Sequence, residues 1–336
     1  MNIKLKDIAK ELGVTVSTVS KAINNRPGVS ENLRKKIIQA VNEKDTPLKY
    51  KIDYEGRKDI LNINLLIRIN MSIENDPFYS FIVEGISKEL QSCKCNLLYH
   101  VLHENKINDN QFNEIFLEKK TDGNIIVGAD YDPGFFDRLK RTGITTVLVD
   151  NIDPDFSSVN TDNYGGAVQA ARHLIDLGHE NIVFISGPLL QNSILERYRG
   201  YCDCLKEHLQ HAKPQLIECP GVSIEDGYNA AKIYQKNEFT AVFCATDKLA
   251  IGAMKALKEK NLNIPEDVSI IGFDDIGWGL HTEPSLSTMR VAKQQAGVLA
   301  AQLFMTNYNQ PENHKVDIKI STNLIRRDST GPLPHR

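Results

Sequence analysis

The sequence predicts a small all-α domain followed by an α/β body, in which two doubly wound parallel sheets carry helices on both faces. Residues 1–46 contain short apolar patterns at helical spacing, interrupted at Gly13. From about residue 60, short β-branched runs alternate with amphipathic stretches, which is the pattern of a parallel sheet with covering helices. Because this pattern falls into similar halves on either side of about residue 160, we expect two subdomains.

The N-terminal segment predicts two short helices joined by a turn at Gly13. Thr15 is a capping residue for the second helix, in which Val19 and Ile23 are expected to face the first. In a helix-turn-helix, the start of the second helix meets base edges in the major groove of DNA. The candidate DNA-contacting residues are therefore Thr15, Val16, Ser17, Thr18, Ser20, Lys21, Asn24 and Arg26.

A third, basic helix is predicted after Ser30, which would cap it. We expect Arg34, Lys35 and Lys36 to be exposed. The buried stripe of this helix is expected to comprise Leu33, Ile37, Ile38 and Val41.

Charge is distributed unevenly along the chain. Residues 1–58 hold 13 Lys or Arg and 7 Asp or Glu, a net charge of +6, whereas the rest of the chain carries −9. A basic head on an acidic body suits contact with phosphates at one end of the chain, and so supports the DNA-binding interpretation.

Seven strands are expected in the body, each a short apolar or β-branched run. They are Ile63–Ile69, Asn96–His100, Gly123–Val127, Thr146–Asp150, Ile182–Ser186, Ala241–Ala245 and Val268–Phe273. Helical patterns lie near residues 79–93, 107–119, 133–142, 164–178, 195–211, 225–236 and 247–260. Sheets of this kind bind ligands at the carboxyl ends of their strands.

Composition excludes several classes of protein. No apolar run approaches the length that spans a bilayer and the N-terminus lacks an export signal, so we expect a cytoplasmic protein. Six cysteines without framework spacing fit a reducing compartment. The chain lacks a nucleophile elbow, a phosphate-binding loop, a dinucleotide fingerprint and a zincin motif, and the pair Gly165 and Gly166 is weak evidence for an anion site. An enzyme is therefore not predicted.

The head resembles the LacI/GalR family of transcription regulators in its Asp-Ile-Ala start, Gly-Val turn, Thr-Val-Ser recognition helix and Asn-Asn-Arg-Pro exit. The body resembles the family's effector domain, which is similar to type I periplasmic sugar-binding proteins. The matching segments are Asp76–Tyr79, Thr121–Gly123, Val159–Asn163, His173–His179, Glu196–Tyr201, Ile264–Val268 and Gly272–Asp275.

The resemblance implies a DNA-binding domain at 1–46, a hinge or linker at 47–60 and an effector-binding and dimerisation domain at 61–336. Within the last, it implies an N-subdomain of about 61–160 plus 289–320. The C-subdomain would comprise about 161–288 plus 321–330, with a last strand near Asn323–Arg326.

The family binds its effector between the subdomains, and the matching positions here are Asn70, Asp76, Phe78, Asp150, Arg197, Asp247 and Asp274. A sugar needs carboxylates and a guanidinium for its hydroxyls and an aromatic face for its ring. Arg197 is favoured because an arginine at a helix start near a strand end has little structural use. Trp278, the single tryptophan, could supply the aromatic face; packing within its loop is the alternative.

Three departures from the family pattern stand out. Thr246 replaces a frequent asparagine, so a different set of hydroxyls is expected to be recognised, and Lys21 replaces a frequent arginine, which changes contact with guanine or leaves a phosphate contact. The linker lacks Ala-Arg-x-Leu. Leu48 and Ile52 have i,i+4 spacing and could wedge into the minor groove, but a solvated tether is an equal alternative.

Cys204, His208 and His211 follow i, i+4, i+7 spacing on one predicted helix, which could hold zinc. Tyr201 and Leu205 already define the buried stripe of that helix, so a structural role is favoured and no metal is predicted.

The sequence therefore predicts a homodimeric, sugar-responsive repressor of carbohydrate-utilisation genes, with no cofactor, that binds a pseudopalindromic operator. The resemblance around Asn75–Tyr79 favours galactosides or β-glucosides as the effector. Whether the effector is a free sugar or a sugar phosphate is left open. The alternative is a cytoplasmic small-molecule-binding protein or an enzyme of the same fold, with a head that contacts nucleic acid non-specifically. A transport-associated binding protein is disfavoured by the basic head.

Overall fold

The structure is a computed structural model, and it divides into two units. We call Met1–Ile60, which is grouped with Ser92–Lys94, the head, and Leu61–Gln91 with Cys95–Arg336 the body. The linker predicted at 47–60 lies outside the described residues except for Ile60. The structure describes residues 9–10, 12–23, 28–30, 32–34, 36–37, 60–68, 76–102, 107–118, 121–128, 134–209, 211, 213–233, 239–310 and 314–333.

The head contains the predicted second helix, α2 (Val16–Ile23). Thr15 caps it as expected, because its Oγ1 accepts a hydrogen bond from the backbone N of Thr18 at 3.1 Å. The core of the head joins Val19 to Ala9, Ala22 and Ile37, all buried. Helix α2 is therefore held by one apolar face and leaves the opposite face outward.

Arg34 differs from its prediction. It is half-buried, and its Nη1 donates to the carbonyl of Ala22 at 3.0 Å, near the end of α2. A cation at this place satisfies a carbonyl that a helix terminus leaves without an intrahelical partner. Lys36 is exposed, as predicted.

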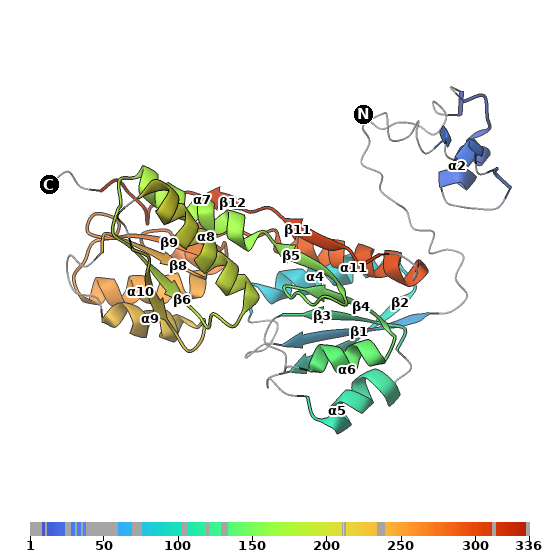
Figure 1. Ribbon diagram of the computed structural model, residues 1–336, viewed down its shortest axis with the longest axis horizontal. Helices are drawn as coiled ribbons and strands as arrows, with labels where there is room; N and C mark the ends of the chain where they lie inside the picture. Colours follow the sequence, from blue (N-terminus) through green and yellow to red (C-terminus); the bar gives the residue numbers. More distant parts are fainter. Residues whose placement is uncertain are drawn as a thin grey trace. The chain divides into compact units, whose positions relative to one another are not determined.

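The body contains two six-stranded sheets (Figure 1). The N-sheet has the order β11-β5-β4-β3-β1-β2, and all its pairs are parallel. Its strands are β1 (Leu61–Arg68), β2 (Cys95–Leu102), β3 (Gly123–Val127), β4 (Thr145–Val149), β5 (Ser157–Thr161) and β11 (Asp317–Ile320).

The C-sheet has the order β12-β10-β9-β8-β6-β7 and is parallel except for the pair β10–β12. Its strands are β6 (Ile182–Ser186), β7 (Gln215–Glu218), β8 (Ala241–Cys244), β9 (Ser269–Asp274), β10 (Ser287–Arg290) and β12 (Asn323–Ile325). The predicted fold class is confirmed, and all seven predicted strands are present.

Helices cover both faces of each sheet (Figure 1). On the N-sheet, α4 and α11 lie on one face and α5 and α6 on the other. The helices are α4 (Tyr79–Leu90), α5 (Asp109–Asn113), α6 (Phe135–Arg141), α7 (Asn163–Asp176), α8 (Asn192–His208), α9 (Ile224–Lys232), α10 (Asp247–Glu259) and α11 (Lys293–Asn309). A π-helix, η3 (Glu114–Glu118), follows α5, and a 3-10 helix, η4 (Gly277–His281), follows β9.

Helices α4 and α11 form a tightly packed pair. A Cβ atom on Gly85 would lie 2.1 Å from the carbonyl oxygen of Gln294, and one on Gly297 would lie 2.0 Å from that of Ile82. Glycine is required at both positions because each helix backbone rests directly on the other. The pair is therefore expected to move as one body.

The chain passes between the sheets where β5 leads to α7, where β10 leads to α11, and between β11 and β12. The second of these connections brings the start of α11 next to the end of β9, because Lys293 bonds to backbone atoms there. We call each sheet with its covering helices the N-subdomain and the C-subdomain.

Two buried histidines anchor the C-terminal segment to the C-sheet. His173 Nε2 lies 3.0 Å from Thr330 Oγ1, and His179 Nε2 lies 3.1 Å from the carbonyl oxygen of Gly331. Burial lowers the pKa of both imidazoles below the ordinary value of 6.5.

These histidines predict acid-sensitive stability. Below pH 6.5 the two histidines bind protons in the unfolded chain but stay neutral in the folded chain. The contribution of the neutral histidines to folding stability is therefore present above pH 6.5 and is lost as the pH falls toward the lowered pKa values. His179→Gln should therefore lose less stability than the parent between about pH 7.5 and about pH 5.5, by about 1 kcal/mol. Denaturant unfolding of both proteins at the two pH values checks this; equal losses would contradict it.

Candidate functional site

The predicted effector residues of the C-subdomain meet at the carboxyl end of its sheet, around Arg197 and Asp274. Arg197 lies in the second turn of α8 and is 3% exposed. Its Nε donates to Asn163 Oδ1 at 2.8 Å, and its Nη1 donates to the carbonyl of Ala245 at 2.6 Å. The guanidinium also lies over the ring of Phe273, 3.8 Å from its centroid.

This setting corrects one step of the sequence argument, since Arg197 has structural contacts as well as a position suited to a ligand. It ties together the start of α7, the end of β8 and the end of β9. The arginine is thereby held in one orientation before any ligand binds, as a recognition residue requires.

Asp274 ends β9 and forms a buried ion pair with Arg197, whose Nη1 lies 3.1 Å from Asp274 Oδ1. Oδ1 accepts no hydrogen bond in the described part of the chain. Burial raises the pKa of Asp274 despite the nearby cations Arg197, Lys293 and Lys248. The carboxylate therefore keeps acceptor capacity that the protein does not use.

The backbone at this point is strained. Asp274 has φ 115° and Asp275 has φ 52°, both in a region that L-residues rarely adopt. Such conformations persist where the surroundings hold them, and they cluster at functional sites.

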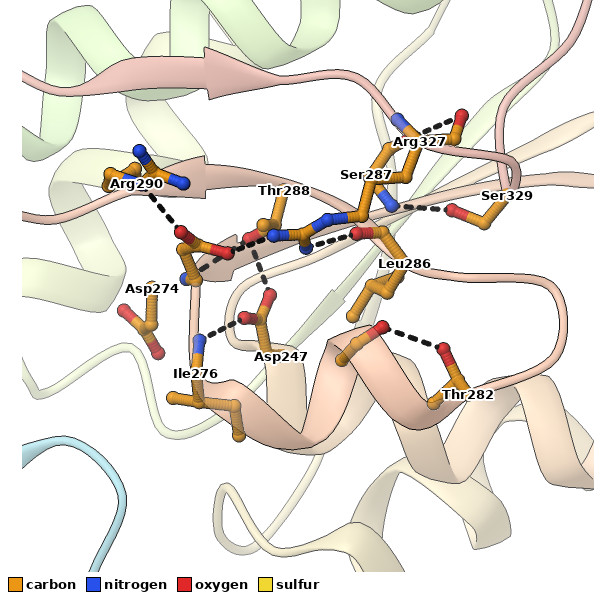
Figure 2. A network of polar contacts seen from close by, with 12 residues as sticks. Asp247, Asp274, Ile276, Thr282, Leu286, Ser287, Thr288, Arg290, Arg327 and Ser329 are labelled. Atoms are coloured by element: carbon orange, nitrogen blue, oxygen red, sulfur yellow. Dashed lines mark hydrogen bonds and ion pairs between the residues drawn. The ribbon is translucent and has the colours of Figure 1, made fainter.

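Asp275 is held by two arginines of the C-subdomain. Arg290 Nε and Arg327 Nη2 each donate to its carboxylate at 2.6 Å. Although partial burial raises its pKa, these hydrogen bonds prevail and lower it below the ordinary value. Figure 2 shows both arginines converging on this point from β10 and from the segment after β12.

Asp247, at the start of α10, lies beneath the same loop and is fully buried. Its Oδ2 accepts from the backbone N of Ile276 at 2.8 Å and its Oδ1 from Thr288 Oγ1 at 2.6 Å (Figure 2). Burial, with the charge of Asp274 second, raises the pKa of Asp247 well above its ordinary value. The contacts that the structure shows for Asp247 position the loop.

On the N-subdomain side, Asp76 precedes α4 and is buried. Its Oδ1 accepts from the backbone N of Phe78 at 2.9 Å and of Tyr79 at 2.7 Å, which fixes the start of the helix. Its Oδ2 lies 3.1 Å from Lys248 Nζ, on the second residue of α10. This ion pair joins the two subdomains.

Phe78 and Asp150 also face this region. Phe78 is half-buried and packs against the core of the C-subdomain. Asp150 follows β4 with φ 56°, and its Oδ2 accepts from Tyr79 Oη at 2.9 Å. Trp278 lies on η4 and is 40% exposed, while Asn70 lies outside the described residues.

The predicted metal-ligand spacing is wrong in one respect. Helix α8 ends at His208, so His211 is not on the same helix as Cys204. Cys204 is buried and its backbone carbonyl oxygen lies 2.9 Å from His208 Nδ1. Among the described residues, no group of three or more potential ligands could hold a metal ion.

In the head, the predicted DNA-contacting residues that the structure describes lie at the start and outer face of α2. Val16 is 38% exposed, and Ser17 and Lys21 are exposed. The hydroxyl of Thr15 caps the helix. Thr18 is half-buried, and its Oγ1 lies 2.9 Å from Thr15 Oγ1. Ser20 lies within the helix, while Asn24 and Arg26 lie outside the described residues.

Three residues of the site were not predicted from the sequence: Asn163, Lys248 and Lys293. Asn163 lies in a segment that the resemblance had marked, so a signal existed. Lys248 and Lys293 carried none, because each acquires its role from a partner far away in the sequence.

Comparison with known proteins matches both parts of the chain. Residues 4–45 match the family of bacterial regulatory proteins of the lacI type, and residues 171–330 match a periplasmic binding protein-like domain. The chain belongs to the LacI family. It is a DNA-binding transcriptional repressor with an effector-binding domain, and the prediction that it is not an enzyme is confirmed by its relatives.

Two curated relatives align over nearly the whole chain. The probable HTH-type transcriptional repressor ExuR of Bacillus subtilis (strain 168) is 29% identical and covers 98% of this chain and 99% of its own length. The repressor PurR of Pasteurella multocida (strain Pm70) is 28% identical, with 97% and 98% covered.

A solved LacI family regulator of Enterococcus faecalis V583, with bound ribose, is 27% identical to this chain. It covers 81% of this chain and all of its own, with a TM-score of 0.71. Within the described residues, no helix is both long and apolar enough to cross a membrane.

Proposed function

We propose that a sugar bound between the N- and C-subdomains controls the operator affinity of this repressor. The observation that carries the proposal is the buried pair of Arg197 and Asp274. Arg197 Nη2 donates no hydrogen bond within the described part of the chain, and Asp274 Oδ1 accepts none. Leaving a buried carboxylate oxygen without a hydrogen bond is costly, so Asp274 Oδ1 favours a polar ligand that donates to it.

Adjacent sugar hydroxyls suit this pair because each hydroxyl both donates and accepts. One hydroxyl accepts from Arg197 Nη2 while its neighbour donates to the carboxylate of Asp274. The ribose in the Enterococcus faecalis relative supports the same class of ligand. From the family resemblance, the further contacts we propose are Asn70, Asp76, Phe78, Asp150 and Trp278. We assign Asp247 to holding the loop, because both its oxygens are already engaged.

A thermal-shift panel tests the class of ligand. Free aldoses, disaccharides, sugar phosphates and purine bases should be compared at equal concentration, and calorimetry should follow for each compound that stabilises. We expect a free sugar to raise the melting temperature, since a ligand at about 100 times its Kd stabilises by about 2.7 kcal/mol. A shift with purine bases and none with any sugar would reject the proposal.

We also propose that the repressor acts as a homodimer on a pseudopalindromic operator. One head reads only a few base pairs, so two heads related by a two-fold axis are needed for a specific site. We also propose that the domains meet at residues 46 and 60 and that the subdomains have the limits that the family resemblance implies. The hinge role of Leu48 and Ile52 is a proposal too, and both residues lie outside the described residues.

Substitutions in α2 should separate base reading from phosphate contact. Val16 and Ser17 are outward at the start of the helix, so changing either should alter the preferred bases, with about 1–3 kcal/mol of discrimination at one base pair. Lys36→Ala, on the exposed side of the third helix, should instead weaken all sequences alike. Selection on randomised half-sites at fixed salt measures both. Unchanged preferences in the Val16 and Ser17 variants would show that another segment reads the bases.

A further inference from the structure

Two lysines cross between the subdomains in opposite directions. Lys248, on α10 of the C-subdomain, reaches Asp76 before α4, with 3.1 Å between Nζ and Oδ2. Lys293, the first residue of α11 in the N-subdomain, donates from Nζ to the carbonyls of Asp274 at 2.5 Å and Asp275 at 3.0 Å. Both lysines are largely withdrawn from solvent. We call these contacts the two lysine clasps.

Lys293 binds the strained backbone at the end of β9. We call Asp274–Ile276 the β9 loop. Its two acceptors are the carbonyls of the residues with positive φ. Other side chains that hold this loop belong to the C-subdomain, among them Arg290 on β10, Arg327 after β12 and Asp247 on α10. Lys293 therefore connects the position of the N-subdomain to the strained backbone of Asp274 and Asp275.

Both clasps engage the same rigid body. Asp76 lies just before α4 and Lys293 begins α11, and these helices are locked by the contacts of Gly85 and Gly297. On the opposite side, Lys248 and the β9 loop are also connected, because α10 carries Asp247, which binds the backbone of Ile276. A shift of the helix pair against the C-subdomain must therefore strain both clasps together.

We propose that the two lysine clasps form one conformational device, in which Lys293 is the positioning residue that links the strained β9 loop to the α4–α11 pair. Loosening either clasp then loosens the other, although the lysines do not share a partner. A ligand that hydrogen-bonds to Asp274 would thus act on the α4–α11 pair through Lys293. The device itself does not depend on the chemical class of the effector.

Hydrogen exchange of the full chain without effector tests the device, and so separates its failure from failure of the proposed sugar site. Lys293→Met removes the donors while keeping an unbranched side chain. We expect exchange to rise about tenfold at the backbone amides of Phe78 and Tyr79, which donate to Asp76 and have no hydrogen bond with Lys293 among the described residues, as well as at Ile276. Lys248→Met should have the reciprocal effect and speed exchange at Ile276.

Two further variants complete the experiment. Lys258→Met removes an exposed lysine of α10 and should leave all these amides unchanged. Lys293→Arg retains donors and should bring exchange at Phe78 and Tyr79 back to within about threefold of the parent. Acceleration confined to the immediate surroundings of each substituted lysine would overturn the proposal. If Lys293→Met is globally unfolded, with α9 also exchanging fast, the reciprocal effect of Lys248→Met decides.

Discussion

Replacing Arg197 with lysine is expected to make operator affinity insensitive to the effector. Lysine keeps a positive charge beside Asp274 but cannot present the planar fork that would bind a sugar hydroxyl while still contacting Asn163 and Ala245. We expect effector affinity to fall by at least about 30-fold, or about 2 kcal/mol. Calorimetry with the sugar identified by the panel measures the loss, and anisotropy measures effector-free operator binding, which should remain within a few fold of the parent.

Two comparisons make this result specific. Arg172→Lys changes an exposed arginine of α7 that pairs with Asp176, and should leave effector affinity unchanged. Arg197→Ala should abolish effector binding and also destabilise the fold by about 3–5 kcal/mol, because the buried carboxylate of Asp274 would lose its ion-pair partner. If Arg197→Lys binds the sugar as tightly as the parent, the effector site has been assigned to the wrong residues.

Gly297→Ala is expected to be strongly destabilising even though alanine favours helices. The added Cβ would lie 2.0 Å from the carbonyl oxygen of Ile82 and 2.8 Å from the backbone N of Ile86, so α11 must move away from α4. The gain in helix propensity is about 1 kcal/mol, whereas forced separation of two backbones costs about 3 kcal/mol or more. We expect a net loss of about 2 kcal/mol and faster proteolysis of the body.

Gly277→Ala is the matched control for this substitution. A Cβ at Gly277 meets nothing within 4 Å, and its φ lies outside the range that side chains avoid. Its effect should stay within about 0.5 kcal/mol. Equal stability of the Gly277→Ala and Gly297→Ala proteins in denaturant unfolding would show that the backbones of α4 and α11 are not in direct contact.

The sequence predicted the central strands because they are buried on both faces. Strands β3 and β4 have five residues each, and the apolar residues of each form a short run between turn signals, which indicates such a strand. Strand β10 was missed for the opposite reason. Its buried residues include Ser287 and Thr288, whose hydroxyls are satisfied by Arg327 and Asp247, partners that lie far away in the sequence.

Helix α11 was missed because it has no single apolar stripe. One side packs on α4 through Gly297, and another packs on the N-sheet, where the ring of Phe304 fills the space beside Gly123. Apolar residues therefore surround much of the helix, and periodicity gives no signal. The clasp of Lys293 could not be predicted for the same reason, since the lysine begins a helix that the pattern did not reveal.

For the site, the family resemblance identified Arg197 and Asp274 but not how they are held. The strained conformations at Asp274 and Asp275 depend on Arg290, Arg327 and Lys293, which come from three separate segments of the chain. Local sequence does not encode such an arrangement, because Arg290 and Arg327 reach Asp275 only when the C-sheet is assembled and Lys293 reaches the loop only when the two sheets are brought together.

The most direct test is a reciprocal linkage measurement on the full chain. Operator affinity should be measured with and without saturating sugar, and sugar affinity with and without saturating operator, at one salt concentration. A sugar that controls the repressor must change operator affinity by the same factor by which operator changes sugar affinity, a coupling of about 1–3 kcal/mol. We predict equal factors of at least about fivefold in both directions. A sugar that binds at Arg197 and Asp274 while leaving operator affinity unchanged would contradict the proposed control.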